Sequence, residues 1–357
     1  DMNKSNTLLN ALDRLRNFNN EKIICKGDPI IQIGTVFYNC KSKNIERYIQ
    51  VIKPDNDNGG ICDDLEGIHV ESCDNEIELL NRWHDLINEK DPDIITGYNI
   101  FGFDFEYIFS RIEFFKNNTT IYENSNLTKF NFGRINKYLD HSQIFKLNKS
   151  YTPNTDVESS YNQSKWINMD GRVIFDIQKE IQSKHNLESY KLDNVASYFI
   201  KGIMLPPDRF NKNSKRIIFI KEYNEFNNNY KYTWLFKTSN LLYLKVGDFI
   251  SFNIHSIGGE VLLNNGYKFK IESINSKYKE IKVSLNELDI SKLYSELINY
   301  NDSKIEWCLN KDDISPKEIF DKHKNGGPEG RSMVAKYCIQ DCELCINLID
   351  LLDIIPN

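Results

Sequence analysis

The stretch DPDIITGYNIFGFDFEYI, residues 91–108, decides the fold of this chain. It contains a short apolar run, residues 94–95, before a turn at Gly97, which is typical of a buried strand. From Asp104 to Phe115 apolar residues recur at helical spacing. A strand that passes directly into a helix predicts an α/β sheet, with Asp104 just beyond the carboxyl end of the strand. Open α/β sheets usually carry their functional sites at that end.

The segments around this stretch fit the same fold class. Apolar, β-branched residues in PIIQIGTVFY predict a strand at 29–38, and GRVIFDI predicts another at 171–177. Apolar residues at helical spacing predict a helix at 75–89, with Asp74 and Asn75 placed to cap its start. Shorter helices are predicted at 178–182 and 192–199, and polar composition predicts loops at 116–130 and 148–166.

Residues 205–310 differ from both flanks, because short alternating runs separated by turn residues predict a β-rich module there. The helical pattern resumes at Ser315 and ends in a strong helix, so the module is predicted to be inserted into the first domain. We therefore expect an α/β domain at 1–204, a small β-barrel-like insertion at 205–310, and the rest of the α/β domain at 311–357.

The insertion is rich in aromatic residues. Aromatic side chains in short strands usually form the core, although some could stack on single-stranded DNA or dock a protein. These residues are Tyr230, Tyr232, Trp234, Phe236, Phe249 and Phe252.

The composition of the 357 residues is that of a folded protein, with 40% hydrophobic and 27% charged residues. No apolar run is long enough for a membrane span and no signal peptide core is present, so we expect an intracellular protein without a membrane partner. A net charge of -6 argues against broad basic binding of nucleic acid, and acidic residues suit divalent cations. The chain begins at Asp1, not Met, which suggests a piece of a longer protein.

Two constellations could carry chemistry. Asp104 at a helix start has the common explanation of a helix cap, but Asn99 and Phe103 accompany it. The spacing of Tyr337 and Asp341 puts a phenol and a carboxylate one turn apart on one helix face. The cysteines of the same helix recur at helical spacing, which favours core packing over zinc. Phosphodiester hydrolysis with two divalent ions needs more carboxylates than the two found here.

Six segments, in order, resemble landmarks of the exonuclease region of family B DNA polymerases, and they are most similar to those of large nucleocytoplasmic DNA viruses. They are GDPIIQIGTVF (27–37), DPDIITGYNIFGFDFEYI (91–108), GRVIFDI (171–177), YKLDNVA (190–196), DDISPKEIF (312–320) and VAKYCIQDCELC (334–345). The β-rich insertion has no counterpart general to that family.

The resemblance implies an RNase H-like 3′→5′ exonuclease that proofreads with two divalent cations, Mg²⁺ or Mn²⁺. It implies that Asp104 and Asp341 are metal ligands and that Tyr337 orients the attacking water. Asn99 and Phe103 would lie near the substrate strand. The family's first motif, Asp-x-Glu on the preceding strand, has no counterpart in residues 1–26, so we expect this chain alone to be weakly active or inactive.

The resemblance also implies partners, namely the single-stranded 3′ end of the primer, the template strand, the remainder of the polymerase chain and a processivity factor. A viral polymerase would act in the host nucleus or in a cytoplasmic virus factory. Two alternatives stay open, a non-catalytic scaffold that binds template and partner proteins, and a free-standing RNase H-like nuclease.

Overall fold

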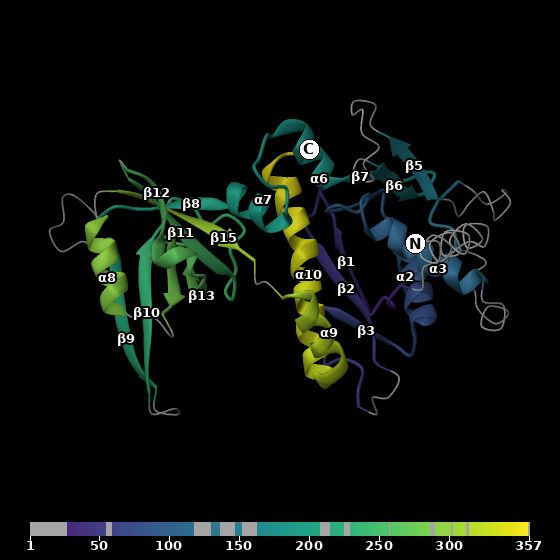
Figure 1. The fold of residues 1–357 in the computed structure, drawn as a ribbon, viewed down its shortest axis with the longest axis horizontal. Helices are drawn as coiled ribbons and strands as arrows, with labels where there is room; N and C mark the ends of the chain where they lie inside the picture. Colours follow the sequence, from purple (N-terminus) through teal and green to yellow (C-terminus); the bar gives the residue numbers. More distant parts are fainter. Residues whose placement is uncertain are drawn as a thin grey trace, which may run out of the picture. The chain divides into compact units, whose positions relative to one another are not determined.

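The protein is described by a computed structural model that covers most of the chain. The described residues are 27–54, 59–117, 130–135, 147–151, 163–207, 215–224, 229–256, 258–285, 290–300, 303–311 and 314–355. By compactness the chain divides into two units, Asp1–Glu180 with Pro316–Cys342, and Ile181–Ser315 with Glu343–Asn357. Each unit has its own strands and helices (Figure 1). This division places residues 181–204 with the second unit.

The first unit contains a sheet of three strands in the order β1-β2-β3. Strand β1 (Gln32–Tyr38) pairs antiparallel with β2 (Ile45–Ile52), and β3 (His69–Cys73) runs parallel to β2. A separate parallel pair consists of β4 (Ile94–Gly97) and β7 (Val173–Asp176). The strands expected near residues 29–38, 94–95 and 171–177 are therefore present.

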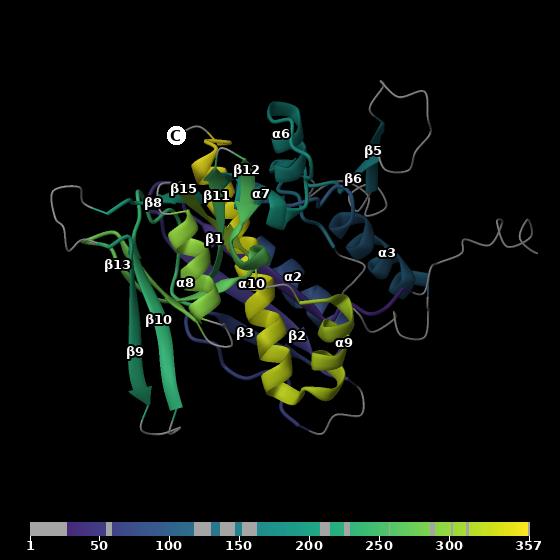
Figure 2. The same ribbon diagram turned by 60° about the vertical axis from the view of Figure 1, so that its left-hand side comes forward.

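Helices cover both faces of the β1-β2-β3 sheet. Ile33 and Phe37 of β1 pack into a cluster with residues of α2 (Glu76–Lys90) and α3 (Asp104–Asn117). The alternate β1 residue Val36 packs instead with α10 (Gly327–Leu351), as the two-residue period of a strand requires. The helix α9 (Pro316–Asn325) precedes α10, and the figures show the two as neighbours (Figure 2).

The start of α2 shows why these residues form a helix there. The Asn75 side chain accepts a hydrogen bond from the Glu78 backbone N–H at 3.0 Å. The Glu78 carboxylate in turn accepts one from the Asp74 N–H at 2.7 Å. This reciprocal arrangement satisfies two backbone donors that a helix start leaves open. The expected capping residue is confirmed.

The expected loop at 148–166 is wrong at both ends. Leu147–Tyr151 (β5) and Gln163–Ile167 (β6) pair as antiparallel strands. The sequence hides them because most of their residues are polar. Trp166 and Ile167 of β6 belong to the core cluster of the first unit. Most of the expected loop at 116–130 lies outside the described residues.

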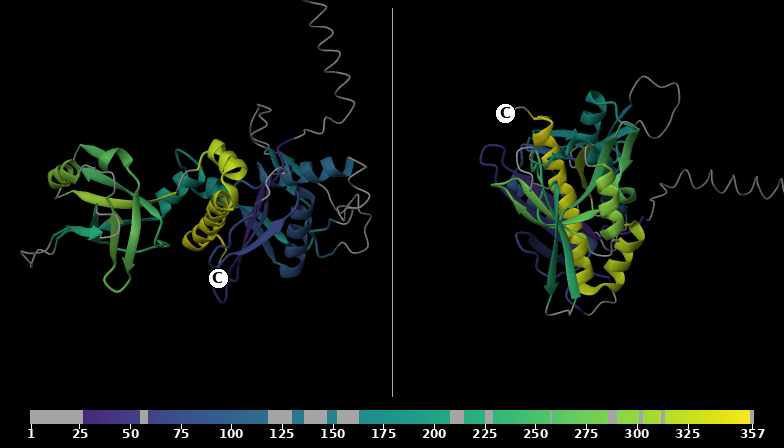
Figure 3. Two further views of the ribbon diagram at one scale, coloured as in Figure 1. Left: turned by 90° about the horizontal axis from the view of Figure 1, so that it is seen from below. Right: turned by 90° about the vertical axis from the view of Figure 1, so that its left-hand side faces the viewer.

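The second unit is built around an eight-stranded sheet, which confirms the β-rich character expected after residue 205. Its strands follow the order β8-β15-β11-β13-β14-β10-β9, with β12 beside β11. Most of these strands are the green arrows of Figure 3. An antiparallel bridge between Met204 and Thr238 links β8 to the end of β10. The strands are β8 (Lys201–Met204), β9 (Ile217–Asn224), β10 (Asn229–Lys237), β11 (Phe249–Ser256), β12 (Gly259–Leu262), β13 (Phe269–Asn275), β14 (Glu280–Ser284) and β15 (Lys304–Asn310).

The core of the second unit is aromatic. Trp234, Phe252 and Trp307 are each 0% exposed, so aromatic residues of the insertion do form its core. The unit also contains the expected helix α7 (Leu192–Phe199) and an unexpected one, α8 (Ile290–Asn299). The short helix expected at 178–182 is α6 (Ile177–Lys184), which lies at the boundary of the two units. Across the described parts of the chain, every helix is too short or too polar to cross a membrane.

Candidate active site

A tight turn carries Asp104 to the first position of α3. Strand β4 ends at Gly97, and Asn99 then adopts a left-handed conformation with φ 60°. Its carbonyl accepts hydrogen bonds from the backbone N–H groups of Gly102 at 3.0 Å and Phe103 at 3.1 Å. A Cβ on Gly102 would lie 2.3 Å from Asn99 Oδ1, so a larger residue there would force the Asn99 side chain to move. Asparagine tolerates the left-handed region better than most residues.

Asp176 anchors the same turn from the neighbouring strand. It is the last residue of β7, pairs in register with Gly97 and is 1% exposed. Its Oδ1 accepts hydrogen bonds from the backbone N–H groups of Asn99 and Gln178, both at 2.9 Å. Its Oδ2 accepts one from the Phe101 N–H at 3.0 Å. This one carboxylate therefore holds the chain that leads to Asp104.

The sequence prediction did not single out Asp176. The signal was present, because the residue ends an apolar strand at the same edge of the sheet as the predicted site. Burial is the main reason why the pKa of the Asp176 carboxyl is raised. The hydrogen bonds from the three backbone N–H groups lower this pKa and partly offset the effect of burial.

Within the described ranges, Asp104 is a carboxylate without a paired cation. Loss of hydration raises the pKa of its carboxyl to about 6, the negative charge of Asp176 adds to this, and its own backbone N–H acts in the opposite direction. By its surface area the residue as a whole is exposed, so solvent still reaches this carboxyl. Among the residues that the structure describes, no Lys or Arg forms an ion pair with Asp104.

The helix α10 brings Asp341 toward the same region of the first unit. A Cβ on Gly34 of β1 would lie 2.7 Å from Cys338 Sγ, and Cys342 Sγ donates a hydrogen bond to the Gly34 carbonyl at 3.6 Å. The absence of a side chain at Gly34 thus allows α10 to lie close to β1. The cysteines Cys338 and Cys342 pack against the sheet, as their helical spacing indicated.

The charges of both predicted metal ligands act on the Cys338 thiol. The pKa of this thiol is lowered, mainly by a hydrogen bond with Cys342. Burial opposes this effect, and so do the negative charges of Asp341 and Asp104. Because both charges act on one thiol, these two carboxylates lie within electrostatic reach of the same atom.

The two substrate-contact candidates are placed differently from each other. Phe103 is 59% exposed and stacks on Tyr107, with ring centroids 5.4 Å apart and planes 20° apart. Asn99 is half-buried, and its side chain lies against Gly102 within its own turn. Tyr337 is half-buried on α10, one turn before Asp341.

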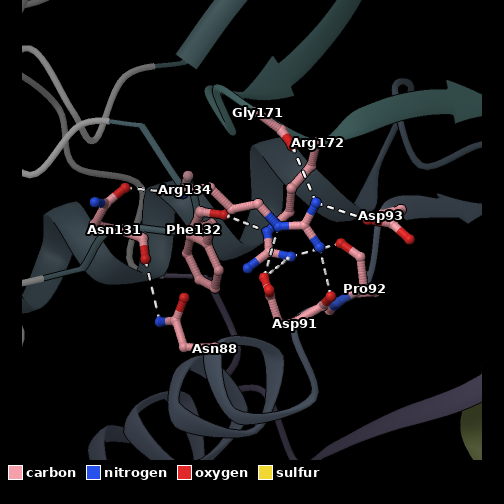
Figure 4. A network of polar contacts seen from close by, with 10 residues as sticks. Asn88, Asp91, Pro92, Asp93, Asn131, Phe132, Arg134, Gly171 and Arg172 are labelled. Atoms are coloured by element: carbon pink, nitrogen blue, oxygen red, sulfur yellow. Dashed lines mark hydrogen bonds and ion pairs between the residues drawn. The ribbon is translucent and has the colours of Figure 1, made fainter.

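The opposite end of the β4–β7 pair is a network of compensated charges (Figure 4). Arg134 binds Asp91 through Nε and Asp93 through Nη1, both at 2.7 Å. Arg172, whose side chain is 2% exposed, contacts Asp91 at 2.8 Å and donates from Nε to the Phe132 carbonyl at 2.8 Å. The pKa of Asp91 is lowered, mainly by the hydrogen bond from Arg134.

Within the described residues, no three His, Cys, Asp or Glu side chains are arranged to hold a metal ion. The seven cysteines within the described ranges are all free thiols. His84, whose ring contacts the backbone of Asn131, has a structural role between α2 and the segment 130–135.

Comparison with protein families matches residues 16–195, about half of the chain, to "DNA polymerase family B, exonuclease domain". The DNA polymerase of Pyramimonas orientalis virus is 34% identical over 335 residues, which cover 93% of this chain and 22% of that protein. The DNA polymerase of Phaeocystis pouchetii virus is 29% identical over 93% of this chain and 29% of its own length. The DNA polymerase delta catalytic subunit of Dictyostelium discoideum is 33% identical over 175 residues, 49% of this chain and 14% of that subunit.

The chain thus spans between about a fifth and a third of the two viral polymerases. The delta subunit matches only about half of the chain, whereas the viral polymerases match nearly all of it. The expected resemblance to family B polymerases, including those of large DNA viruses, is confirmed.

Proposed function

Because this chain belongs to the family B DNA polymerases and carries their exonuclease domain, we propose that it removes the mispaired 3′-terminal nucleotide of a primer during replication. Asp104 is the observation that supports this most. Among the described residues this carboxylate has a raised pKa, a second carboxylate, Asp176, nearby and no counter-cation, which is electrostatically costly unless a cation binds there. Such costs are typical of functional sites.

Two divalent cations, Mg²⁺ or Mn²⁺, would supply activation of the attacking water and stabilisation of the leaving oxygen. Asp104 and Asp341 would each offer a carboxylate to such a cation, and this is supported by the charges of both acting on the Cys338 thiol. Further carboxylates are needed to complete the ligands of two ions, and residues 1–26 contain no counterpart of the family's Asp-x-Glu motif that would supply them. We therefore propose that this chain alone trims DNA weakly or not at all.

The other residues act on substrate and water. Tyr337 would orient the attacking water through its phenol, since it lies one helical turn from Asp341. The exposed ring of Phe103 would stack on the terminal base of the single strand, and Asn99 would contact the same strand. Asp176 would hold the turn that presents Asn99, Phe103 and Asp104.

The fold that we propose for the first unit is RNase H-like, with the limits 1–204 and 311–357 for the exonuclease domain. For the insertion at 205–310 we propose a small barrel. The bridge from Met204 to Thr238 supports this, because it links the first strand in the order to the end of β10.

The partners that we propose follow from the family. They are the single-stranded 3′ end of the primer, the template strand, the remainder of the polymerase chain and a processivity factor. We propose that the complete protein also adds nucleotides, and that it works where viral DNA is replicated in the infected cell.

The test uses the complete polymerase and a mismatched primer. Asp104→Ala and Asp341→Ala should each slow 3′-end trimming by roughly a thousandfold, because a metal ligand is lost, while nucleotide addition stays near the parental rate. Tyr337→Phe should slow trimming by about tenfold, since water is held less well but the cations remain.

The matched control is Asp93→Ala, which removes a carboxylate that is 88% exposed at the other end of the β4–β7 pair. It should trim at the parental rate. If Asp104→Ala and Asp341→Ala trim as fast as the control, the site is not catalytic and the non-catalytic scaffold becomes the better hypothesis.

A further inference from the structure

The β9–β10 hairpin of the second unit extends beyond the sheet that supports it. Strand β10 pairs with β14 only from Thr233 to Lys237. It pairs with β9 further along, from Asn229 to Phe236. The far end of the hairpin therefore has strand neighbours on fewer sides than its base, and both ribbons project past the rest of the unit (Figure 2).

One face of this hairpin end is aromatic. The register places Tyr230 opposite Tyr223 and Tyr232 opposite Lys221. These residues share a face with Trp234, because alternate residues of a strand point to the same side. Trp234 is 0% exposed in the core, whereas Tyr230 is 50% and Tyr223 is 54% exposed. The core-facing side of the hairpin thus continues into solvent as a tyrosine surface.

The tyrosine rings are arranged as a group and not as isolated side chains. The Tyr223 and Tyr230 ring centroids lie 5.2 Å apart, and those of Tyr230 and Tyr232 lie 6.5 Å apart. Lys221 Nζ lies over the Tyr230 ring at 3.8 Å and over the Tyr232 ring at 5.5 Å. We call these four residues, Lys221, Tyr223, Tyr230 and Tyr232, the tyrosine face.

The charge on the tyrosine face is positive and uncompensated among the described residues. Within the described residues, the Lys221 ammonium group contacts the rings of Tyr230 and Tyr232 and forms no ion pair with a carboxylate. On the other side of the same hairpin, charges are paired, since Lys231 binds Glu272 at 2.8 Å and Lys282 binds Glu222 at 2.9 Å. A cation beside half-exposed rings is complementary to a ligand that has both flat aromatic groups and negative charge.

We propose that the tyrosine face binds single-stranded nucleic acid, with bases stacked on Tyr223 and Tyr230 and Lys221 beside a backbone phosphate. Unpaired bases offer the free faces that stacking needs, whereas a duplex keeps its bases stacked on each other. One lysine supplies too little charge for binding by phosphates alone, so the rings must provide much of the affinity. This binding is independent of the proposed nuclease site, because it requires neither cations nor cleavage.

The experiment measures binding of the full 357-residue chain to a fluorescein-labelled oligothymidylate by fluorescence anisotropy at low salt. The double variant Tyr223→Ala/Tyr230→Ala should bind about tenfold more weakly, because base stacking is lost. Tyr223→Phe/Tyr230→Phe keeps both rings and should bind within about twofold of the parent.

The matched control is Tyr278→Ala. Tyr278 is 55% exposed and has Lys277 Nζ at 5.4 Å from its ring, but it stands alone in the turn between β13 and β14. Its removal should leave affinity unchanged. Circular dichroism checks that each variant is folded.

Lys221→Glu tests the same face with all rings retained, and it should weaken binding about tenfold through repulsion of the phosphates. An abasic strand of equal length should bind more weakly than oligothymidylate, since it offers phosphates without bases. The proposal is overturned if the abasic strand binds equally well, or if Lys221→Glu and the double alanine variant both bind like the parent. The latter result would leave a protein partner as the occupant of this face.

Discussion

The two ends of the β4–β7 pair treat charge in opposite ways. At the amino end, Asp91 and Asp93 are bound by Arg134, and Arg172 adds a second contact to Asp91. At the carboxyl end, Asp104 has no recorded cation among the described residues, and the nearby negative charge of Asp176 raises its pKa further. The same two strands thus carry a compensated network and an uncompensated site.

The difference separates a structural role from a functional one. Ion pairs at the amino end lower the pKa of Asp91 and join three segments that are distant in sequence. Desolvation at the carboxyl end raises the pKa of Asp104, which costs stability at neutral pH. A destabilising carboxylate such as Asp104 is useful to the protein only when a ligand binds to it, and a cation is the simplest such ligand.

The largest effect on stability is expected from the amino end. Arg172→Ala should lower the free energy of unfolding by about 3 kcal/mol, because it removes a buried side chain and leaves the Phe132 and Pro92 carbonyls without their donor. Urea denaturation measures the change, and hydrogen exchange of peptides from β4 and β7 locates it. Arg134→Ala removes a more exposed side chain and should cost less; an equal or larger cost would contradict the importance given to Arg172.

A smaller effect is expected from the anchor at the carboxyl end. Asp176→Asn should lower the free energy of unfolding by about 2 kcal/mol, since the amide keeps one acceptor oxygen for three backbone donors. In the complete polymerase it should slow trimming with little change in primer binding, because the turn that carries Asp104 moves. Faster exchange of the amides of Asn99 and Phe101 would support this role, and unchanged exchange would contradict it.

The smallest effect has the opposite sign. Asp104→Asn should raise the free energy of unfolding at pH 7 by about 1 kcal/mol, a value reduced for the solvent access of this side chain. An acid with a pKa of about 6 in the folded protein and 3.8 in the unfolded chain takes up a proton on folding between these values. The parent should therefore gain stability as pH falls from 7 to 5.

The comparison of the two proteins across this pH range isolates Asp104, because the raised pKa of Asp176 affects both in the same direction. The stabilisation by Asp104→Asn should be present at pH 7.5 and lost near pH 4. A variant that is less stable than the parent at pH 7.5 would show that Asp104 has a stabilising partner.

Local patterns predicted much of the fold. The cap at Asn75, the helix that begins at Asp104 and the helix Leu192–Phe199 follow from spacing and capping within a few residues. The β5–β6 pair was missed, because its strands are polar and their pairing depends on a partner that periodicity does not reveal. The aromatic residues of the insertion do not all lie in the core. Trp234 is buried and Tyr230 is half-exposed, although their side chains point to the same face of β10.

The sequence by itself determined the α/β class, the β-rich insertion, the family and the start of α3 at Asp104, since each depends on residues close together in the chain. Only the tertiary structure revealed that Asp176 holds the turn before Asp104, and that Asp341 acts on the same thiol as Asp104. Hydrogen bonds and electrostatic forces act over distances in space, and the folded chain brings together groups that are more than seventy residues apart. A linear pattern contains no measure of that distance.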